Sequence, residues 1–150
     1  MRMISIKLLE PLRFNDVADV VNESLEEGFN FLRRLVNDYQ NGQNTFRMLG
    51  EALFGVFTME NELIAIGGLN IDPFANNPKV GRLRRFYVSK SYRRMGLGKL
   101  LVNEIIEHAT LHFTELVLHT DTSEADVFYR AIGFEKASRY PNSTHFMKLE

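Results

Sequence analysis

The apolar residues in the first third of the chain follow strand spacing and then helix spacing. Met3–Leu9 alternates loosely and stops short of Pro11, which predicts an edge strand. Asn15 or Asp16 is expected to cap the helix that follows, and Gly28 to interrupt it. Two helices are therefore expected, with apolar faces formed by Val17, Val20, Val21 and Leu25, and by Phe31, Leu32, Leu35, Val36 and Tyr39 before Asn41-Gly42.

The middle of the chain predicts a loop and three strands. Gln40–Gly50 is polar and irregular, as expected of a surface loop that orders over a ligand. Ala52–Met59 and Leu63–Ile71 have the composition of strands and flank a short polar turn of hairpin length. The loop Asp72–Lys79 then leads into a strand at Val80–Val88.

The last third predicts a long amphipathic helix and several shorter elements. The long helix should run from near Gly96 to about Phe113, because its apolar residues keep the i, i+3, i+4 spacing of one buried face. The other elements are expected at Glu115–Thr120 (strand), Glu124–Ala131 (helix, ended by Gly133), Glu135–Ser138 and Thr144–Leu149 (strands). The order β-α-α-β-β-β-α-β-α-β-β contains no repeat and no linker. We therefore expect one α/β domain over residues 1–150 with a mixed sheet.

Composition excludes several classes of protein. Of the 150 residues, 45% are hydrophobic and 25% are charged, which excludes disordered and collagen-like chains. The absence of cysteine excludes disulfides, thiolate metal sites and cysteine nucleophiles. A net charge of −1 gives no bulk attraction to nucleic acid or acidic membranes, and the sequence shows neither a secretory signal nor 18 consecutive apolar residues. We expect a soluble, cytoplasmic protein with no nucleic-acid or membrane partner.

Basic residues are concentrated in one segment. Arg82–Lys99 contains seven Lys and Arg and no Asp or Glu, whereas the rest of the chain carries 11 basic and 19 acidic residues. This asymmetry indicates an anionic ligand, with a solvated basic strand as the alternative. Glycines in Arg93–Lys99 let the backbone approach a ligand, and the first N–H groups of the following helix would favour phosphate. Neither G-x-G-x-x-G nor G-x-x-x-x-G-K-[ST] fits, because Leu101 and Leu100 stand at required positions.

Two short motifs stand in order on this framework. Residues 86–98 read FYVSKSYRRMGLG, a strand end followed by Arg-x-x-Gly-x-Gly, and residues 125–134 read ADVFYRAIGF. Together they resemble the signatures of the GNAT superfamily of acyl-CoA-dependent N-acetyltransferases, with Lys90 where proline is common. The resemblance spans essentially the whole chain. It implies a mostly antiparallel, twisted sheet, splayed between its fourth and fifth strands and flanked by about four helices.

The resemblance also implies where acetyl-CoA would bind as co-substrate. Pantetheine would pair with the backbone of Phe86, Tyr87 and Val88 along the free edge of the fourth strand. The Val88 N–H would lie near the thioester carbonyl and stabilise the oxyanion. The pyrophosphate would lie against the turn and the helix start. The residues implied there are Arg93, Arg94, Gly96, Leu97, Gly98 and Lys99.

The resemblance implies Tyr129 as the general acid. A phenol is neutral at pH 7 and can protonate the departing CoA thiolate. From the residues alone, the alternative is an aromatic ring packed in the core beside Phe128 and Phe134.

Two departures from the superfamily pattern leave the general base open. Thr122 stands where many relatives carry asparagine, and Arg82 where some carry a glutamate base. The acceptor amine would lose its proton through water to one of Glu62, Asp72, Asp121 and His119. No metal site is expected, because His108 and His112 are typical of a solvated helix face; His145 is expected to be structural.

The function implied is transfer of an acetyl group from acetyl-CoA to the primary amine of a small molecule or peptide, by direct attack in a ternary complex. A non-catalytic acyl-CoA-binding regulatory module and a basic nucleic-acid binder are the alternatives. The two N-terminal helices and the loops Gln40–Gly50 and Asp72–Lys79 should hold the acceptor. Acidic residues there suit a cationic amine; they are Glu23, Glu26, Glu27 and Asp38. A homodimer is one assembly to expect, since dimers are common in the superfamily.

Overall fold

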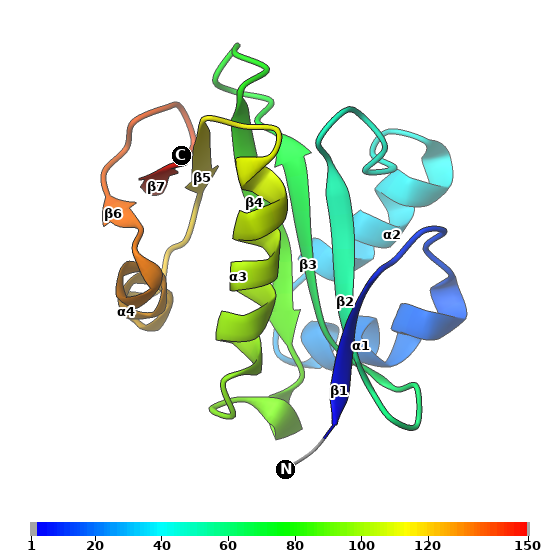
Figure 1. Ribbon diagram of the computed structural model, residues 1–150. Helices are drawn as coiled ribbons and strands as arrows, with labels where there is room; N and C mark the ends of the chain where they lie inside the picture. Colours follow the sequence, from blue (N-terminus) through cyan, green and yellow to red (C-terminus); the bar gives the residue numbers. More distant parts are fainter. Residues whose placement is uncertain (1–2, 150) are drawn as a thin grey trace.

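In the part of the chain that the structure describes, seven strands form one sheet with helices on both of its faces (Figure 1). The computed structural model describes residues 3–149. The strands are β1 (Ile4–Leu8), β2 (Ala52–Thr58), β3 (Leu63–Ile71), β4 (Val80–Val88), β5 (Glu115–Leu118), β6 (Glu135–Lys136) and β7 (His145–Lys148). The helices are α1 (Phe14–Glu26), α2 (Phe31–Asn41), α3 (Leu97–Thr110) and α4 (Ser123–Ile132), with a short 3-10 turn, η1 (Lys90–Tyr92). In the order β1-β2-β3-β4-β5-β7-β6, the β4–β5 pair is parallel and the other pairs are antiparallel. The prediction of a mixed, mostly antiparallel sheet is confirmed.

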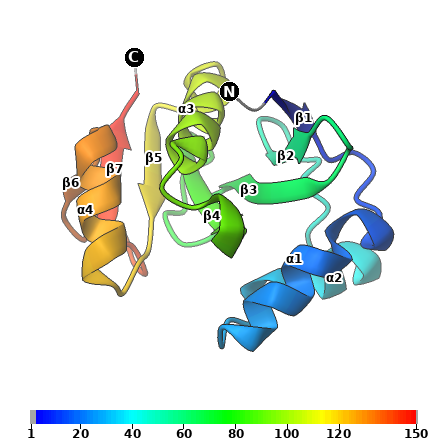
Figure 2. The same cartoon turned by 90° about the horizontal axis from the view of Figure 1, so that it is seen from below.

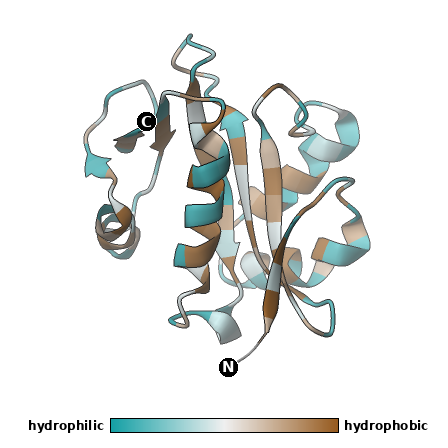
Figure 3. Cartoon of the chain, viewed as in Figure 1, coloured by the Kyte–Doolittle hydropathy of each residue, from teal (hydrophilic) through white to brown (hydrophobic). Residues whose placement is uncertain are grey.

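The central strands are buried because helices cover both faces of the sheet. α3 packs on one face, and α1 and α2 pack on the other (Figure 2). Leu63–Asn70 of β3 is buried throughout, so this strand forms an almost continuous apolar run in place of an alternating one. Leu101 and Ile105 of α3 fill one core, and Leu32 and Leu35 of α2 fill the other. The outward face of α3 is largely hydrophilic (Figure 3).

Two helix ends differ from the prediction. α1 begins directly after Arg13, whose side chain makes no capping hydrogen bond, so neither Asn15 nor Asp16 is the cap. The Asp16 N–H already donates to the Arg13 carbonyl (3.0 Å), which starts the helix earlier. α3 ends at Thr110 because the chain then tightens into a turn that brings Phe113 into the core. Within residues 3–149, no helix is both long and apolar enough to cross a membrane.

β4 and β5 pair over three residues of β4, Val80–Arg82, and then separate. On the other side of β4, a β-bulge places Arg85 and Phe86 opposite Gly67, with Arg85 at a left-handed φ of 57°. From Leu83 onward, no strand of the described chain pairs with the β5-facing edge of β4, while β5 leads away toward α4 (Figure 1). The predicted splay between the fourth and fifth strands is confirmed.

Candidate active site

A cavity of about 1030 Å³ lies where β4 separates from β5. Its walls are the free edge of β4, the turn from β4 into α3, and the β5–α4 segment, with α2 and the β3–β4 loop on the far side. Nine of the predicted site residues line it: Phe86, Tyr87, Val88, Arg93, Arg94, Gly96, Gly98, Lys99 and Tyr129. Leu97 is the exception. Its side chain is buried in the core beside α3, so its backbone N–H is the group left to serve a ligand at the turn.

The free edge of β4 presents the backbone of Val88 to the cavity. The Ser89 N–H donates to the Ile64 carbonyl on β3 (2.8 Å). Because N–H groups of successive strand residues point to opposite edges, the Val88 N–H points away from β3 and into the gap. The Val88 carbonyl faces the same way and accepts a hydrogen bond from Nε of Arg93 (3.0 Å). The Val88 N–H is therefore a backbone donor directed at the splay.

The turn between β4 and α3 has the geometry of an anion site. Gly96 is the N-cap of α3 at φ 82°, and Arg94 also has a left-handed φ, of 63°. The first intrahelical bond runs from the Leu100 N–H to the Gly96 carbonyl (3.1 Å), so the N–H groups of residues 97–99 have no helical partner. A side chain at Gly98 would lie 3.3 Å from the Phe128 ring, so glycine lets α3 begin close to α4. Backbone donors and the positive end of the helix dipole meet at this turn.

Arg93 is held by contacts within the protein. Nη1 and Nη2 donate to the two carboxylate oxygens of Glu27 (2.9 and 2.5 Å), and the guanidinium lies 5.3 Å from the centre of the Tyr87 ring. The bidentate bond from Arg93, together with the Tyr87 O–H, lowers the pKa of Glu27 to about 2. Arg93 lines the cavity while tying the end of α1 to the carbonyl of Val88.

The Tyr87 hydroxyl lies between the carboxylates of Glu23 on α1 and Glu27, the C-cap of that helix. Its oxygen is 2.7 Å from Glu23 Oε2 and 2.5 Å from Glu27 Oε1, so a single phenolic proton is shared by both acceptors. Burial and these hydrogen bonds raise the pKa of Tyr87. Glu23 also accepts from the Ser89 hydroxyl (3.1 Å) and the Lys90 N–H (3.1 Å). The acidic end of α1 therefore anchors the chain that carries the turn.

Tyr129 is a buried tyrosine of the cavity wall, like Tyr87, and is 7% exposed. Its ring centre lies 5.0 Å from that of Phe128, 5.6 Å from that of Phe134 and 6.2 Å from that of Phe86. Burial raises the pKa of the phenol, which stays protonated at neutral pH. Tyr129 both packs in the core and lines the cavity, so a packing role does not exclude the role of general acid.

α4 is positioned by hydrogen bonds at its start and along one side. The Thr122 hydroxyl caps the helix by accepting from the Ala125 N–H (3.1 Å). Asp126 lies 2.7 Å from Nε2 of His145 on β7 and also pairs with Arg130 (2.9 Å). The Arg130 and His145 contacts lower the pKa of Asp126 to about 2. His145 is buried and links β7 to α4.

The four candidate bases lie in different environments. Asp72 is buried and bound to Arg82 (2.6 Å), with its second oxygen making no hydrogen bond to a described residue. Glu62 lies in a separate small hollow next to Tyr92. His119 and Asp121 line the main cavity, pair at 3.5 Å and are solvent-exposed. Of the four, these last two have direct access to the cavity.

Several lining residues were not assigned to the site from the sequence. Arg34, Phe29 and Phe31 come from α2 and the chain just before it, and Phe74 comes from the β3–β4 loop. The aromatic residues that follow Gly28 could have indicated a ligand site, but their spacing also fits an ordinary buried helix face. Phe29 and Phe74 are each 43% exposed, which is unusual for rings that serve packing alone.

The loop Gln40–Gly50 lies outside the cavity wall. None of its residues lines the cavity. Phe46 is buried in the core under α1 and α2, and Asn44 and Asn70 exchange two side-chain hydrogen bonds (2.9 and 3.0 Å). The expectation that this loop orders over a ligand has no support from its position, because the loop is already bound to β3.

Comparisons with known proteins give a consistent result. The sequence model of the Acetyltransferase (GNAT) family matches residues 17–134. A protein from Exiguobacterium sp. 255-15, described as an acetyltransferase, is 27% identical, with a TM-score of 0.83 over 97% of this chain and 93% of that chain. A GNAT-family acetyltransferase from Staphylococcus aureus Mu50 is 18% identical, with a TM-score of 0.78 over 99% and 100%. The GNAT-family N-acetyltransferase YhbS from Escherichia coli, solved in complex with CoA, is 16% identical, with a TM-score of 0.71 over 100% and 83%. At these low identities, the last two similarities show a shared fold alone.

Proposed function

The chain belongs to the GNAT acetyltransferase family, and on that premise we propose that it transfers an acetyl group from acetyl-CoA to a primary amine. Both substrates would be bound together, and the amine would attack the thioester directly. One observation carries the proposal: the Val88 N–H, the helix-start turn at Gly96 and the phenol of Tyr129 border the same cavity.

In the proposed step, the Val88 N–H and the phenol of Tyr129 act on the reacting atoms, while the turn at Gly96 would hold the co-substrate. The amine lone pair attacks the thioester carbonyl carbon, and negative charge develops on the carbonyl oxygen, where the Val88 N–H would donate. The new N–C bond remains and the C–S bond breaks as the tetrahedral intermediate collapses. Tyr129 would give its proton to the leaving sulfur, and water would carry the proton of the amine back to the phenol. The products are an amide and free CoA.

The cofactor half of the cavity offers donors in the order that acetyl-CoA needs. The free edge of β4 can pair with an extended amide chain, as an added strand would. The N–H groups at the start of α3, with Arg94 and Lys99 beside them, suit a pyrophosphate. Arg93 would support the turn through Glu27 and Val88, with part of its guanidinium still facing the cavity.

A non-catalytic acyl-CoA-binding module is the second candidate. It is favoured by the position of Arg82, which pairs with the most buried candidate base, Asp72, and leaves only exposed groups to take a proton. Water remains a sufficient proton acceptor for an amine that is already neutral, so we place acetyl transfer first.

Thiol release tests the proposal. The protein is mixed with acetyl-CoA and a broad panel of primary amines, and free CoA is measured against an enzyme-free control. Release that depends on one class of amine, with the acetylated amine found by mass spectrometry, is the expected result. CoA binding without amine-dependent release would instead favour the regulatory module.

A further inference from the structure

The half of the cavity that faces α2 is lined by arginines. Arg34 on α2 and Arg82, Arg84 and Arg85 on β4 all contribute to this wall. Among the described lining residues of the whole cavity, Asp121 is the one acidic residue. Glu23 and Glu27, whose charge suggested a cationic acceptor from the sequence, do not line the cavity and are bound to Tyr87, Ser89, Lys90 and Arg93.

These arginines lie on the opposite face of β4 from α3. Leu83 packs into the core beneath α3, so Arg84, the next residue along the strand, points to the α1–α2 face. Arg85 confirms the direction, because its Nη2 lies 3.8 Å from Asp38 on α2. The β-bulge at Arg85 interrupts the alternation of side chains along the strand. Arg84 and Arg85 therefore both border the cavity, and Phe86 faces α3 and α4. The arginine wall, formed by Arg34, Arg82, Arg84 and Arg85, therefore lies on the α1–α2 side of β4.

Within residues 3–149, two of these arginines are bonded to no acidic side chain. Arg82 is paired with Asp72, and Arg85 has the weaker contact with Asp38. The guanidinium groups of Arg34 and Arg84 make no hydrogen bond or ion pair with any residue in 3–149 that the structure describes. Burial and the neighbouring Arg82 lower the pKa of Arg84, as expected for a cation that lacks a close partner. Arg84 is half-buried and Arg34 is exposed at the rim. Guanidinium groups without a bonded counterion are favourable sites for a carboxylate or phosphate, which they bind in bidentate fashion.

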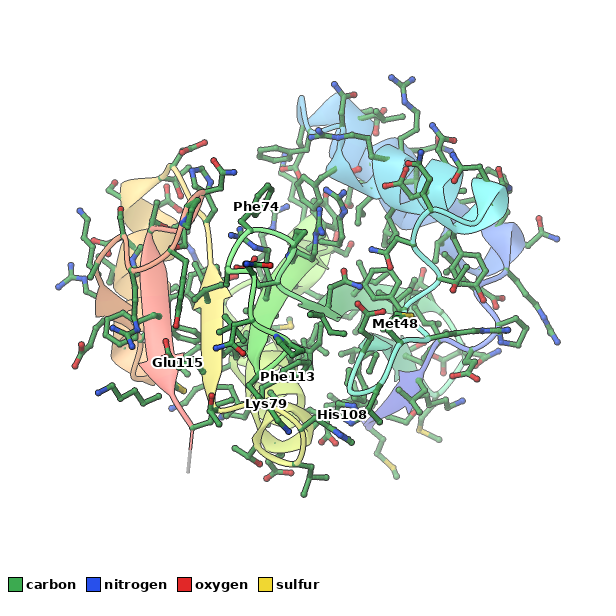
Figure 4. All side chains as sticks on the ribbon, turned by 90° about the horizontal axis from the view of Figure 1, so that it is seen from above. Met48, Phe74, Lys79, His108, Phe113 and Glu115 are labelled. Carbon is green, nitrogen blue, oxygen red and sulfur yellow. The ribbon has the colours of Figure 1, made fainter. Side chains whose placement is uncertain are left out.

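Exposed aromatic rings stand beside the arginines. Phe29 precedes α2, and Phe74 lies on the loop between β3 and β4, where Figure 4 shows it between the β5 part of the sheet and the α1–α2 layer. The Phe74 ring lies 5.0 Å from the guanidinium carbon of Arg82, so the charged and apolar surfaces are continuous. Such a surface fits a ligand with an anionic group next to an apolar body.

We propose that the acceptor is an amine that carries its own anionic group, a carboxylate or a phosphate, which the wall of Arg34 and Arg84 binds. That this amine is the acceptor rests on the proposed acetyl transfer. Binding of its anionic group to the arginines can be measured without turnover. The anion would hold the molecule on the α2 side of β4 while its amine reaches the thioester at the splay.

Matched amines test the charge preference. L-phenylalanine is compared with 2-phenylethylamine, and O-phosphoethanolamine with ethanolamine; within each pair, the molecules differ by the anionic group. Binding to the CoA-saturated protein is measured by calorimetry, and thiol release is measured with acetyl-CoA. At least one anionic member should bind roughly tenfold or more tightly than its partner. The pair with the larger ratio distinguishes carboxylate from phosphate, and equal or tighter binding of the uncharged-tail amines would overturn the proposal.

Three variants identify the wall. Arg34→Gln and Arg84→Gln should each weaken binding of the preferred anionic amine about tenfold, leaving CoA affinity within twofold. Arg33→Gln is the matched control, because Arg33 is the exposed neighbour on α2 and does not line the cavity. Loss of CoA affinity in Arg34→Gln would assign the wall to the co-substrate and overturn the inference.

The two proposals fail in different ways. Arginine-dependent binding of an anionic amine without thiol release would support the anion site and count against acetyl transfer. Turnover of neutral-tail amines that neither arginine variant affects would support acetyl transfer and overturn the anion site.

Discussion

Tyr129 packs among aromatic rings and also lines the cavity. Phe128 and Phe134 hold the ring at 5.0 and 5.6 Å, and Tyr129→Phe keeps these contacts. The substitution removes only the proton donor, so the maximal rate should fall about 10²–10⁴-fold while CoA affinity stays within a few-fold. Steady-state kinetics and calorimetry on the same preparations measure both effects. A loss in rate without a loss in binding marks an interaction made in the transition state.

The pH profile provides the control for this substitution. Burial raises the pKa of Tyr129, so the phenol remains protonated through neutral and mildly alkaline pH, and its ionisation should not reduce the rate there. The rate should instead rise with pH as the acceptor amine loses its proton. An unchanged rate in Tyr129→Phe at every pH would show that Tyr129 serves packing and is not the general acid.

Gly96 tests the location of the pyrophosphate site. Its φ is 82°, and an added Cβ would meet no heavy atom within 4 Å. Gly96→Val would therefore cost backbone strain of roughly 1–2 kcal/mol and would place a branched side chain where a ligand must approach the turn. We expect the variant to fold and to lose the rise in melting temperature that CoA produces in the parent.

Gly42→Val is the matched control for Gly96→Val. Gly42 ends α2 at φ 84°, and an added Cβ there also meets nothing within 4 Å, so both variants carry the same kind of strain. Only the control should keep the CoA-induced shift. Parental CoA affinity in Gly96→Val would mean that the pyrophosphate binds elsewhere.

At the scale of the elements, Glu27 joins α1 to the β4–α3 turn. Its folded-state pKa is about 2, against an ordinary value of 4.5, because Arg93 and Tyr87 donate to the carboxylate. A lowered folded-state pKa contributes stability that is complete above pH 4.5 and is lost as the pH falls toward 2. Allowing for partial solvent exposure, the contribution is about 1–2 kcal/mol.

Glu27→Gln should therefore unfold more readily than the parent at pH 7. The difference in the free energy of unfolding, measured by urea titration, should shrink as the pH is lowered from 4.5 to 2, because the parent then also loses the charge. Glu26→Gln is the control, since Glu26 is the exposed neighbour on the same helix. A difference between Glu27→Gln and the parent that does not change with pH would show that the carboxylate charge is not what stabilises the junction.

At the scale of the molecule, the sheet is two parts joined by a short parallel pair. β4 meets β5 over Val80–Arg82, and the cavity occupies the rest of the gap. A ligand in this gap contacts both parts, so binding should stabilise the whole fold. At 100 times its dissociation constant, CoA would add about 2.7 kcal/mol, which corresponds to a rise of roughly 5–11 °C in melting temperature.

Calorimetric or fluorescence melting curves with CoA, NAD and ATP test this effect. CoA should raise the melting temperature, and NAD and ATP should not, because only CoA carries the pantetheine chain that pairs with β4. Equal shifts with CoA, NAD and ATP would indicate a general anion site without specificity for CoA.

Local patterns in the sequence determined the elements and the turn. The run Leu63–Ile71 and the helical spacing after Gly96 reflect burial on two faces and on one face, respectively, and both are readable from neighbouring residues. The sequence also allowed the functional turn and the aromatic motif to be identified, because a helix start and a packed motif constrain residue type locally. These residues are Gly96, Gly98, Phe128 and Tyr129.

The tertiary structure decided which residues meet across the splay. Arg93 was expected at the pyrophosphate, yet its guanidinium also binds Glu27, 66 positions earlier in the chain. Arg34 and Phe74 join the arginines of β4 because α2 and the β3–β4 loop pack on the same face of the sheet. Periodicity reports whether a side chain is buried, but its partners are set by the register of distant strands and the packing of helices, which depend on the whole chain at once.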